Sequence, residues 1–236
     1  PIVATTAYAA KDEVETIRVG FFHFDGYHDI SDQGVRSGYG YQFLRLLSRY
    51  TNLNFEYVGY DKSWDEMQKM LENGEIDMVT SMHYTADRAQ RFGFSTYIGF
   101  SNTIMTVRND NTTIKSENYA DFDGMKVGFL ENSSRNEKFR TYAEDHDFQY
   151  KPVYFEDQEE MTDALKNGEV DAIVTSNLRK LSQERIIEEF DTSKFYAVVK
   201  KENEELLSKI NYGISQMDIY EGDWRSKLHY NNYDVE

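Results

Sequence analysis

The sequence predicts an α/β protein that is divided into two similar lobes. The principal observation is a repeat, since Leu71-Glu-Asn-Gly-Glu-Ile-Asp77 recurs in similar form as Leu165-Lys-Asn-Gly-Glu-Val-Asp171. In both copies the glycine can close a helix in the left-handed conformation, and a short apolar strand follows. Both strands end in a Thr-Ser pair, at Ser81 and Ser176. Because ligands bind at the carboxyl ends of strands in open α/β sheets, the repeat predicts a cleft between the lobes.

The first lobe is predicted from residues 17–81, in which strands and helices alternate. Apolar patterns predict strands at 17–22, 53–57 and 76–79. This strand–helix order implies a largely parallel sheet with right-handed crossovers. The two helices are indicated by apolar side chains at helical spacing, namely Phe43, Leu46, Leu47 and Tyr50, and then Trp64, Met67 and Leu71.

The second lobe repeats this order over residues 125–176. Strands are predicted at 125–130, 150–154 and 170–174, and two helices lie between them. The lobe is therefore expected to share the topology of the first. Its helices are indicated by Phe139, Tyr142, Ala143 and His146, and then by Met161, Ala164 and Leu165.

The segment between the repeats is expected to carry the chain from one lobe to the other. Thr85 suits the N-cap of a helix or the start of a tight turn. Residues 92–97 are expected to be irregular, and residues 103–107 predict a strand. We expect the crossing between the lobes at the polar loop of residues 109–113.

The last part of the chain is expected to return to the first lobe. Leu181, Ile186, Ile187 and Phe190 suggest a helix, and residues 195–199 predict the returning strand. A long amphipathic helix over 206–217 would then pack on the first lobe. With two crossings, the predicted division is 14–106 for the first part of lobe 1, 107–196 for lobe 2, and 197–236 for the return segment and C-terminal helices of lobe 1.

Composition and charge restrict the classes of function. The formal net charge of −16 argues against binding to nucleic acid or to anionic lipid. The chain has no cysteine, which excludes disulfides and thiolate chemistry. Ala7-Tyr8-Ala9 resembles the cleavage site of a secretory signal, and no run of the sequence is long enough to span a bilayer. We therefore expect an extracytoplasmic protein.

A set of short motifs, found in a fixed order along the chain, resembles the bacterial extracellular solute-binding proteins of family 3. The resemblance covers nearly all of residues 17–230, and it is specific as a set rather than motif by motif. The motifs are Ile17-Arg-Val-Gly20, Gly38-Tyr-Gly-Tyr-Gln-Phe43, Asn73-Gly-Glu-Ile-Asp77, Ser81-Met-His-Tyr-Thr-Ala-Asp-Arg88, Phe94-Ser95, Asp123-Gly-Met-Lys-Val-Gly128 and Asn167-Gly-Glu-Val-Asp171.

The resemblance implies a two-lobed fold of the periplasmic-binding-protein type II class, which closes around a small ligand. That ligand is expected to be an amino acid or a related small carboxylate. The partner would be the permease of an ABC transporter. Because the Gly38-Tyr-Gly-Tyr41 variant is similar to sensor input domains, a membrane-bound signalling domain is the alternative. The resemblance also implies a monomer.

The resemblance assigns ligand-binding roles in the first lobe. Arg88 matches the arginine that pairs with the ligand carboxylate, and a planar guanidinium suits that group. Ser81 and His83 match positions that contact the ligand, although the family usually has Ser or Thr where this chain has His83. That departure brings either a titratable ring into the site or a ring that packs on Tyr84. The aromatic loop supplies Phe24 and Tyr27, of which Phe24 is the preferred stacking residue.

In the second lobe, Ser133 and Ser134 match a hydroxyl pair at a helix N-terminus, where an anionic group is favoured. Simple helix capping is the other interpretation of these serines. Ser176 stands where the family usually has the aspartate that binds the ligand ammonium. The ligand therefore lacks an α-amino group, or another acid such as Asp25 substitutes for the missing one.

A dehydratase on the same fold is the competing enzyme hypothesis, since a few relatives are dehydratases. It would need a cleft acid with a raised pKa, and Glu131 is the best-placed candidate. We predict no catalytic residue. The five histidines never reach metal-ligand spacing beside acidic residues, so no metal or cofactor is expected.

Overall fold

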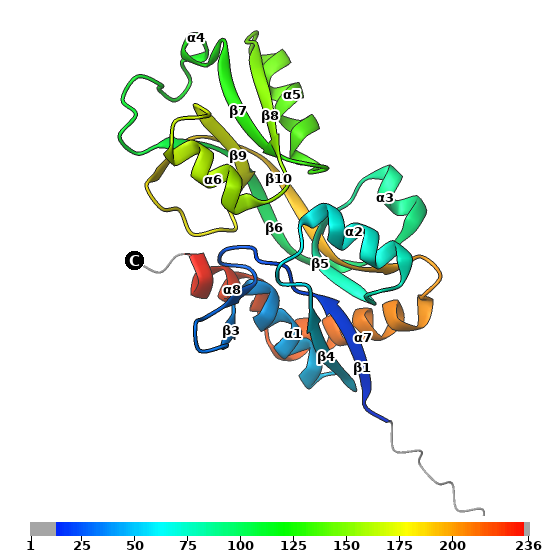
Figure 1. Cartoon of the computed structure of the whole chain (residues 1–236). Coiled ribbons are helices and arrows are strands. Elements are labelled where there is room, and N and C mark those ends of the chain that lie inside the picture. Colours follow the sequence, from blue (N-terminus) through cyan, green and yellow to red (C-terminus); the bar gives the residue numbers. More distant parts are fainter. Residues whose placement is uncertain (1–12, 234–236) are drawn as a thin grey trace, which may run out of the picture.

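The computed structural model describes residues 13–233, which form two lobes joined by one continuous eight-stranded sheet (Figure 1). The predicted fold class, a two-lobed α/β protein, is confirmed. The predicted signal remnant at residues 7–9 lies outside the described residues.

The first lobe contains three parallel strands and the helices that cover them. Strand β1 pairs in parallel with both β4 and β5, as the alternation of strands and helices predicts. The elements up to the first crossing are β1 (Glu15–Gly20), β2 (Asp29–Ile30), β3 (Arg36–Ser37), α1 (Tyr39–Arg49), β4 (Leu53–Val58), α2 (Trp64–Asn73), β5 (Met78–His83) and α3 (Ala86–Arg91). The C-terminal helices α7 (Glu204–Tyr220) and α8 (Trp224–Tyr233) return to this lobe (Figure 1).

The second lobe repeats this arrangement. Strand β7 pairs in parallel with β8 and β9. The elements of this lobe are α4 (Tyr119–Phe122), β7 (Met125–Leu130), α5 (Arg135–Asp145), β8 (Tyr150–Phe155), α6 (Gln158–Lys166) and β9 (Ala172–Ser176).

Two strands of 17 residues each join the lobes. They are β6 (Phe92–Arg108) and β10 (Glu184–Lys200), which pair antiparallel along their length. The sheet order is β4-β1-β5-β10-β6-β9-β7-β8, so both long strands lie at its centre. Figure 1 shows them passing from one lobe to the other. The predicted lobe boundaries after residues 106 and 196 fall inside these two strands.

Two local predictions were wrong at these strands. Residues 92–97 form the start of β6, and residues 184–190 form part of β10 instead of a helix. Strand β6 has also reached the second lobe before the loop at 109–113, because its residues 103–106 already pair with β9. The physical reason is long-range pairing. The β-branched Ile186 and Ile187 suit a strand, and β6 pairs with this segment on both sides of Ile187, at Ile186 and Glu188.

The helix ends follow the sequence signals. Ser63 and Glu66 form a capping box at the start of α2, and Gly74 closes this helix with φ 77°. Gly168 takes φ 76° after α6, at the matching place in the second lobe. Thr85 Oγ1 accepts a hydrogen bond from Arg88 N, which fixes the start of α3. The repeat therefore encodes the same helix-to-strand turn twice.

Each lobe has apolar cores on both faces of its sheet. In the first lobe, α1, α7 and α8 cover one face of the sheet and contribute Phe43, Ile210 and Trp224 to its core. Helix α2 covers the other face. In the second lobe, α5 contributes Phe139 to one core and α6 contributes Met161 to the other. Two separate cores per lobe make each lobe rigid, so movement between them is expected at the crossing strands.

Gly99 lies on β6 opposite Phe195 of β10, where the chain crosses between the lobes. A Cβ at Gly99 would lie 2.7 Å from Tyr39 Oη, and closer still to the buried Phe195 ring. Tyr39 Oη is fixed there by a 2.7 Å hydrogen bond to Ile98 O. We predict that Gly99→Ala lowers the free energy of unfolding by about 1–3 kcal/mol, because overpacked cores must shift. Urea denaturation measures this loss.

The matched control for this prediction is Gly93→Ala on the same strand. A Cβ there would meet the end of the Leu207 side chain at 3.1 Å, and its other neighbours lie at ordinary contact distances of 3.5 Å and 3.8 Å. A smaller loss than for Gly99→Ala is expected. Equal losses for the two variants would show that the crossing is no more tightly packed than the rest of β6.

Candidate functional site

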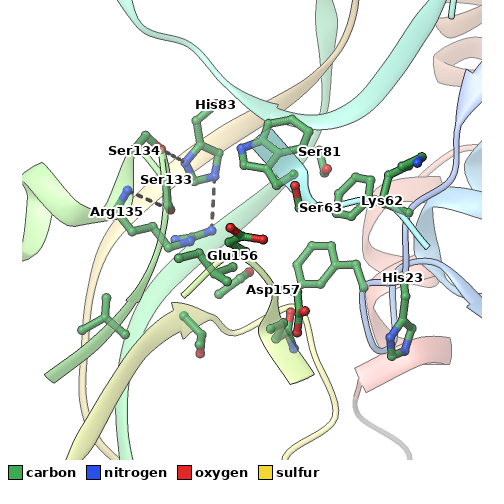
Figure 2. A pocket seen from close by; sticks show the side chains of 18 of the residues that line it. His23, Lys62, Ser63, Ser81, His83, Ser133, Ser134, Arg135, Glu156 and Asp157 are labelled. Carbon is green, nitrogen blue, oxygen red and sulfur yellow. Dashed lines mark hydrogen bonds between the residues drawn. The ribbon is translucent and has the colours of Figure 1, made fainter. Parts of the chain in front are cut away.

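A cavity lies between the lobes at the carboxyl ends of the strands. Its volume of about 110 Å³ is several times what one water molecule needs, so it has room for a small organic molecule. Ser81 and Ser176, the ends of the two repeated strands, both line it. The predicted cleft is therefore present where the repeat places it. Figure 2 shows side chains from both lobes converging on this cavity.

Arg88 is held at the cavity by the first turn of α3. Its side chain is buried, with 5% of the residue exposed. Nη1 donates to the carbonyl of His83 at 3.0 Å, and Nη2 donates to the carbonyl of Asn132 at 3.3 Å. The guanidinium lies 5.8 Å from the centre of the Trp64 ring. Burial lowers the pKa of Arg88 to about 10, so the group remains charged at neutral pH.

His83 connects the two lobes across the cavity. Its Nδ1 lies 3.0 Å from Ser134 Oγ, and its Nε2 lies 2.9 Å from Ser101 Oγ and 3.3 Å from Arg135 Nη2 (Figure 2). A guanidinium can only donate, so Nε2 must accept and the ring proton belongs on Nδ1. The proton on Nδ1 is then donated to Ser134.

The protonation state of His83 agrees with these contacts. Burial lowers the pKa of this ring well below 6.5, and the positive charges of Arg135, Lys138 and Arg88 lower it further. The imidazole is therefore neutral at physiological pH. The histidine that replaces the usual Ser or Thr serves as a hydrogen-bonding bridge, rather than as a charged group or a ring stacked on Tyr84.

A second contact between the lobes lies beside the cavity. Asn132 Nδ2 donates to Asp65 Oδ1 at 2.6 Å, and the carbonyl of the same residue accepts from Arg88. Asn132 takes the left-handed conformation, with φ 55°. Asn is one of the few residues that adopt it readily. The lobes are thus in direct contact at the site.

The predicted serines all line the cavity. Ser81 adopts a left-handed φ of 64°, which costs a non-glycine residue on the order of 1 kcal/mol. Ser133 Oγ accepts from Arg135 N at 3.3 Å, and Ser134 makes no side-chain cap for α5 because its hydroxyl bonds to His83. Ser176 Oγ accepts from the backbone N–H of Leu178 at 2.9 Å.

Of the two predicted aromatic residues, the structure places only Phe24 at the cavity. Tyr27 is fully buried in the core of the first lobe, where its ring stacks on Tyr39 and meets Phe195 edge-on. The aromatic loop therefore contributes one ring to the site and one to the core. Phe22 also lines the cavity, stacked on Phe24.

The acidic candidates lie elsewhere. Neither Asp25 nor Glu131 lines the cavity, and Glu131 is exposed to solvent. Two other acids do line it, namely the exposed Glu156 and Asp157 at the start of α6 (Figure 2). Asp157 Oδ1 also caps this helix by accepting from Glu160 N at 2.8 Å. Carboxylates are thus present on the second-lobe side of the cavity, but not at the expected strand end.

Sequence reasoning missed Arg135 and Trp64 as site residues. Trp64 was assigned to a helix face, and the capping box that starts α2 turns it to the cavity. Arg135 directly follows the serine pair, and this position was the available signal. Its burial could not be read from the sequence, because it depends on packing against β6 residues Ser101 and Thr103.

Comparison with known proteins agrees with this geometry. Residues 23–222 match the model of the bacterial extracellular solute-binding proteins, family 3. The chain belongs to this family. The comparison of this solute-binding protein with curated proteins found no match.

Solved structures with similar folds include three amino-acid-binding relatives. An ancestral arginine-binding protein bound to arginine is 26% identical, with a TM-score of 0.78 over 92% of this chain and 98% of that one. The "probable amino-acid ABC transporter extracellular-binding protein ytmK from Bacillus subtilis" is 21% identical, with a TM-score of 0.75 over 93% and 98%. The ancestral amino acid-binding protein AncCDT-1, a precursor of cyclohexadienyl dehydratase, is 21% identical, with a TM-score of 0.76 over 92% and 95%.

Two further properties of this solute-binding protein concern residues 13–233. Within them, no group of three His, Asp or Glu side chains is arranged to hold a metal ion. No helix in the same part of the chain is long and apolar enough to cross a membrane.

The buried histidines predict an acid sensitivity. Burial lowers the pKa of His28 to about 3 and that of His83 well below 6.5, so both bind protons more readily in the unfolded chain. Stability is therefore complete above about pH 6.5 and falls as the pH decreases below it. At pH 5 the loss from His28 alone is about 2 kcal/mol. Urea denaturation at pH 7.5 and pH 5.0 measures it.

The variants His28→Gln and His83→Gln should each reduce the difference in stability between the two pH values. His23→Gln, which replaces an exposed ring, is the control and should change the difference less than either variant, because burial and not the nearby His23 is the largest cause of the lowered pKa of His28. If His28→Gln and His83→Gln both kept the full difference in stability between the two pH values, the assignment to these histidines would be contradicted.

Proposed function

We propose that this protein is an extracytoplasmic solute receptor that closes its two lobes around a small carboxylate ligand, most simply an amino acid. The similarity to binding proteins of ABC transporters supports a role in uptake, in which the ligand is delivered to the permease of such a transporter. In this proposal the protein is a monomeric binder, and it performs no chemistry on its ligand. Closure is driven by contacts that the ligand makes with both lobes at once.

The observation that carries the proposal is the buried guanidinium of Arg88. Its hydrogen bonds go to two backbone carbonyls, and no carboxylate of the described residues forms an ion pair with it. A buried charge without a counter-ion is costly, and a ligand carboxylate would supply the missing partner in a bidentate geometry. Arg88 also touches the second lobe at Asn132, so a ligand bound here would contact both lobes.

The ammonium of an amino acid would need a different partner from the usual aspartate. Ser176 occupies that position, and its hydroxyl already accepts from Leu178 N. Glu156 and Asp157 line the same cavity, and they are the acids that the geometry favours for this role. They replace Asp25, which does not line the cavity, in this part of the proposal.

The arrangement supports binding more than catalysis. A general acid or base in a cleft is expected to be desolvated and directed at the substrate. Glu131 is exposed and outside the cavity, and the two acids that line it are also exposed. The buried ionisable groups at the site are Arg88, Arg135 and the neutral His83. These groups hold anions rather than move protons.

A thermal-shift screen tests the proposal. The protein is heated with amino acids, small dipeptides, carboxylates and polyamines, and a ligand that binds only the folded state raises the melting temperature. At a ligand concentration of 100 times Kd the stabilisation is about 2.7 kcal/mol. We expect ligands that carry a carboxylate to shift the melting temperature, and Arg88→Gln to remove the shift.

The matched control is Arg91→Gln on the same helix. Arg91 is paired with Asp87 and Glu72 outside the cavity, so this variant should keep the shift. A shift that survives in Arg88→Gln, or one given only by amines without a carboxylate, would overturn the proposal. NMR of the recovered ligand completes the test, since any chemical conversion would contradict a purely binding function.

A further inference from the structure

Arg135 is a second buried cation in the same cavity. It is the first residue of α5, lines the cavity, and is 9% exposed. Nη1 donates to Thr103 Oγ1 at 2.7 Å and Nη2 to Ser101 Oγ at 3.0 Å, while His83 Nε2 lies 3.3 Å from Nη2. All of these partners are neutral. The guanidinium is therefore fixed in position without a counter-charge.

Another buried arginine in the same lobe, Arg179, can be compared with Arg135. Arg179 is also buried, and it forms an ion pair with the buried side chain of Glu184 at 2.5 Å. Asp191 is the acid whose charge acts on Arg135, but it is outside ion-pairing distance and is itself paired with Lys138 at 2.7 Å. Removing a cation from water without a partner costs several kcal/mol. Folding alone gives no reason for an arginine here.

The position of Arg135 on its helix adds to this cost. The N-terminus of a helix carries partial positive charge, so a cation in the first turn is repelled and an anion is attracted. The hydroxyl of Ser134, the residue before α5, bonds to His83 and does not cap the helix. The guanidinium and the start of α5 thus present positive charge to the same side of the cavity.

We infer that the ligand carries two anionic groups, one held by Arg88 and the other by Arg135, as in a small dicarboxylic acid or an acidic amino acid. Arg88 bonds to the carbonyl of His83 and Arg135 faces its ring, so the two anion sites flank one residue. This inference rests on the proposed function, because it names the ligand class of that same cavity. Arg135 discriminates between a side-chain carboxylate and its uncharged amide.

Isothermal titration calorimetry with matched ligand pairs tests the inference. The probes are L-glutamate with L-glutamine, L-aspartate with L-asparagine, and succinate with succinamic acid. We expect the acid of at least one pair to bind about 10–100 times more tightly than its amide, since one hydrogen-bonded charge pair is gained. Arg135→Gln should abolish this preference, whereas Arg88→Gln should weaken both members of the pair.

Two further variants separate a binding role from a structural one. Arg135→Lys retains the charge and should keep part of the preference for the acid. Arg140→Gln removes the same charge from an exposed position on α5, where the arginine is paired with Glu137 and Glu144, and should change nothing. The melting temperature of Arg135→Gln without ligand should not fall, because a cation without a counter-ion has been removed.

The outcomes distinguish this inference from the proposed function. Equal binding of acid and amide that depends on Arg88 would overturn the inference and leave the receptor function intact. An Arg135→Gln variant that melts lower and weakens acid and amide equally would show that Arg135 is structural, which also overturns it. Binding that is independent of both arginines would count against both proposals. No binding of any of these probes would overturn the inference alone, because the wider thermal-shift screen tests the receptor function separately.

Discussion

The antiparallel pair of β6 and β10 is the constraint on which the rest of the structure depends. Each strand is hydrogen-bonded in both lobes, so the lobes cannot separate without breaking the central sheet. The lobes can bend relative to each other only where the pairing between β6 and β10 is interrupted. Register shifts occur at Phe190/Thr192 and at Phe195/Tyr196, on either side of the crossing, and Asp191 has φ 54°. Such bulges bend strands locally and are suited to a hinge.

The hinge and the cavity share residues. Ser101 and Thr103 lie on β6 at the crossing, and their hydroxyls hold Arg135 from the second lobe. Ser101 also lies within hydrogen-bonding distance of His83 from the first lobe. A change in the angle between the lobes must therefore move the cationic groups relative to each other. In the proposed receptor, this geometry would couple the ligand contacts directly to lobe closure.

The charge distribution gives the cavity its chemical character. The whole chain carries a formal charge of −16, yet the buried ionisable groups at the cavity are two guanidiniums and a neutral imidazole. In a low-dielectric cavity these cations act strongly on an anion that enters. The surrounding acidic surface disfavours bulky polyanions such as nucleic acids. This contrast between surface and cavity is the basis for proposing a small anionic ligand.

Most of the fold could be predicted from the sequence, because the decisive signals are local. The glycines at 74 and 168, the Thr85 cap and the helix stripes other than the one at 181–190 each act within a few residues, and these predictions were confirmed. The failures at 92–97 and 184–190 concern segments whose conformation depends on a partner strand about 100 and about 80 residues away, respectively. At 184–190 an apolar spacing that suits a helix was overridden by strand pairing that no local pattern records.

Site residues could be predicted where residue type and motif agree. They could not be predicted where the position of a side chain depends on how it is buried. Ser81 and Ser176 follow from their place at the repeated strand ends, whereas Arg88, Ser133 and Ser134 follow from the resemblance to the family. Tyr27 and Phe24 belong to one loop, yet one ring turns to the core and the other to the cavity. Arg135 could be recognised only from its surroundings, because an arginine at the start of a helix is usually exposed. The difference lies in tertiary packing, which one sequence does not reveal.

His83 shows why this combination of residues is self-consistent. Its ring lies between cations, so a proton on Nε2 would add a third positive charge and leave this nitrogen unable to accept from Arg135. The ring therefore stays neutral, with its single proton fixed on Nδ1 and directed at Ser134 of the other lobe. A serine in its place could not reach both Ser134 and Ser101. The exchange of a small hydroxyl for an imidazole thus joins the contact between the lobes to Arg88 and Arg135, the two arginines proposed to bind the ligand.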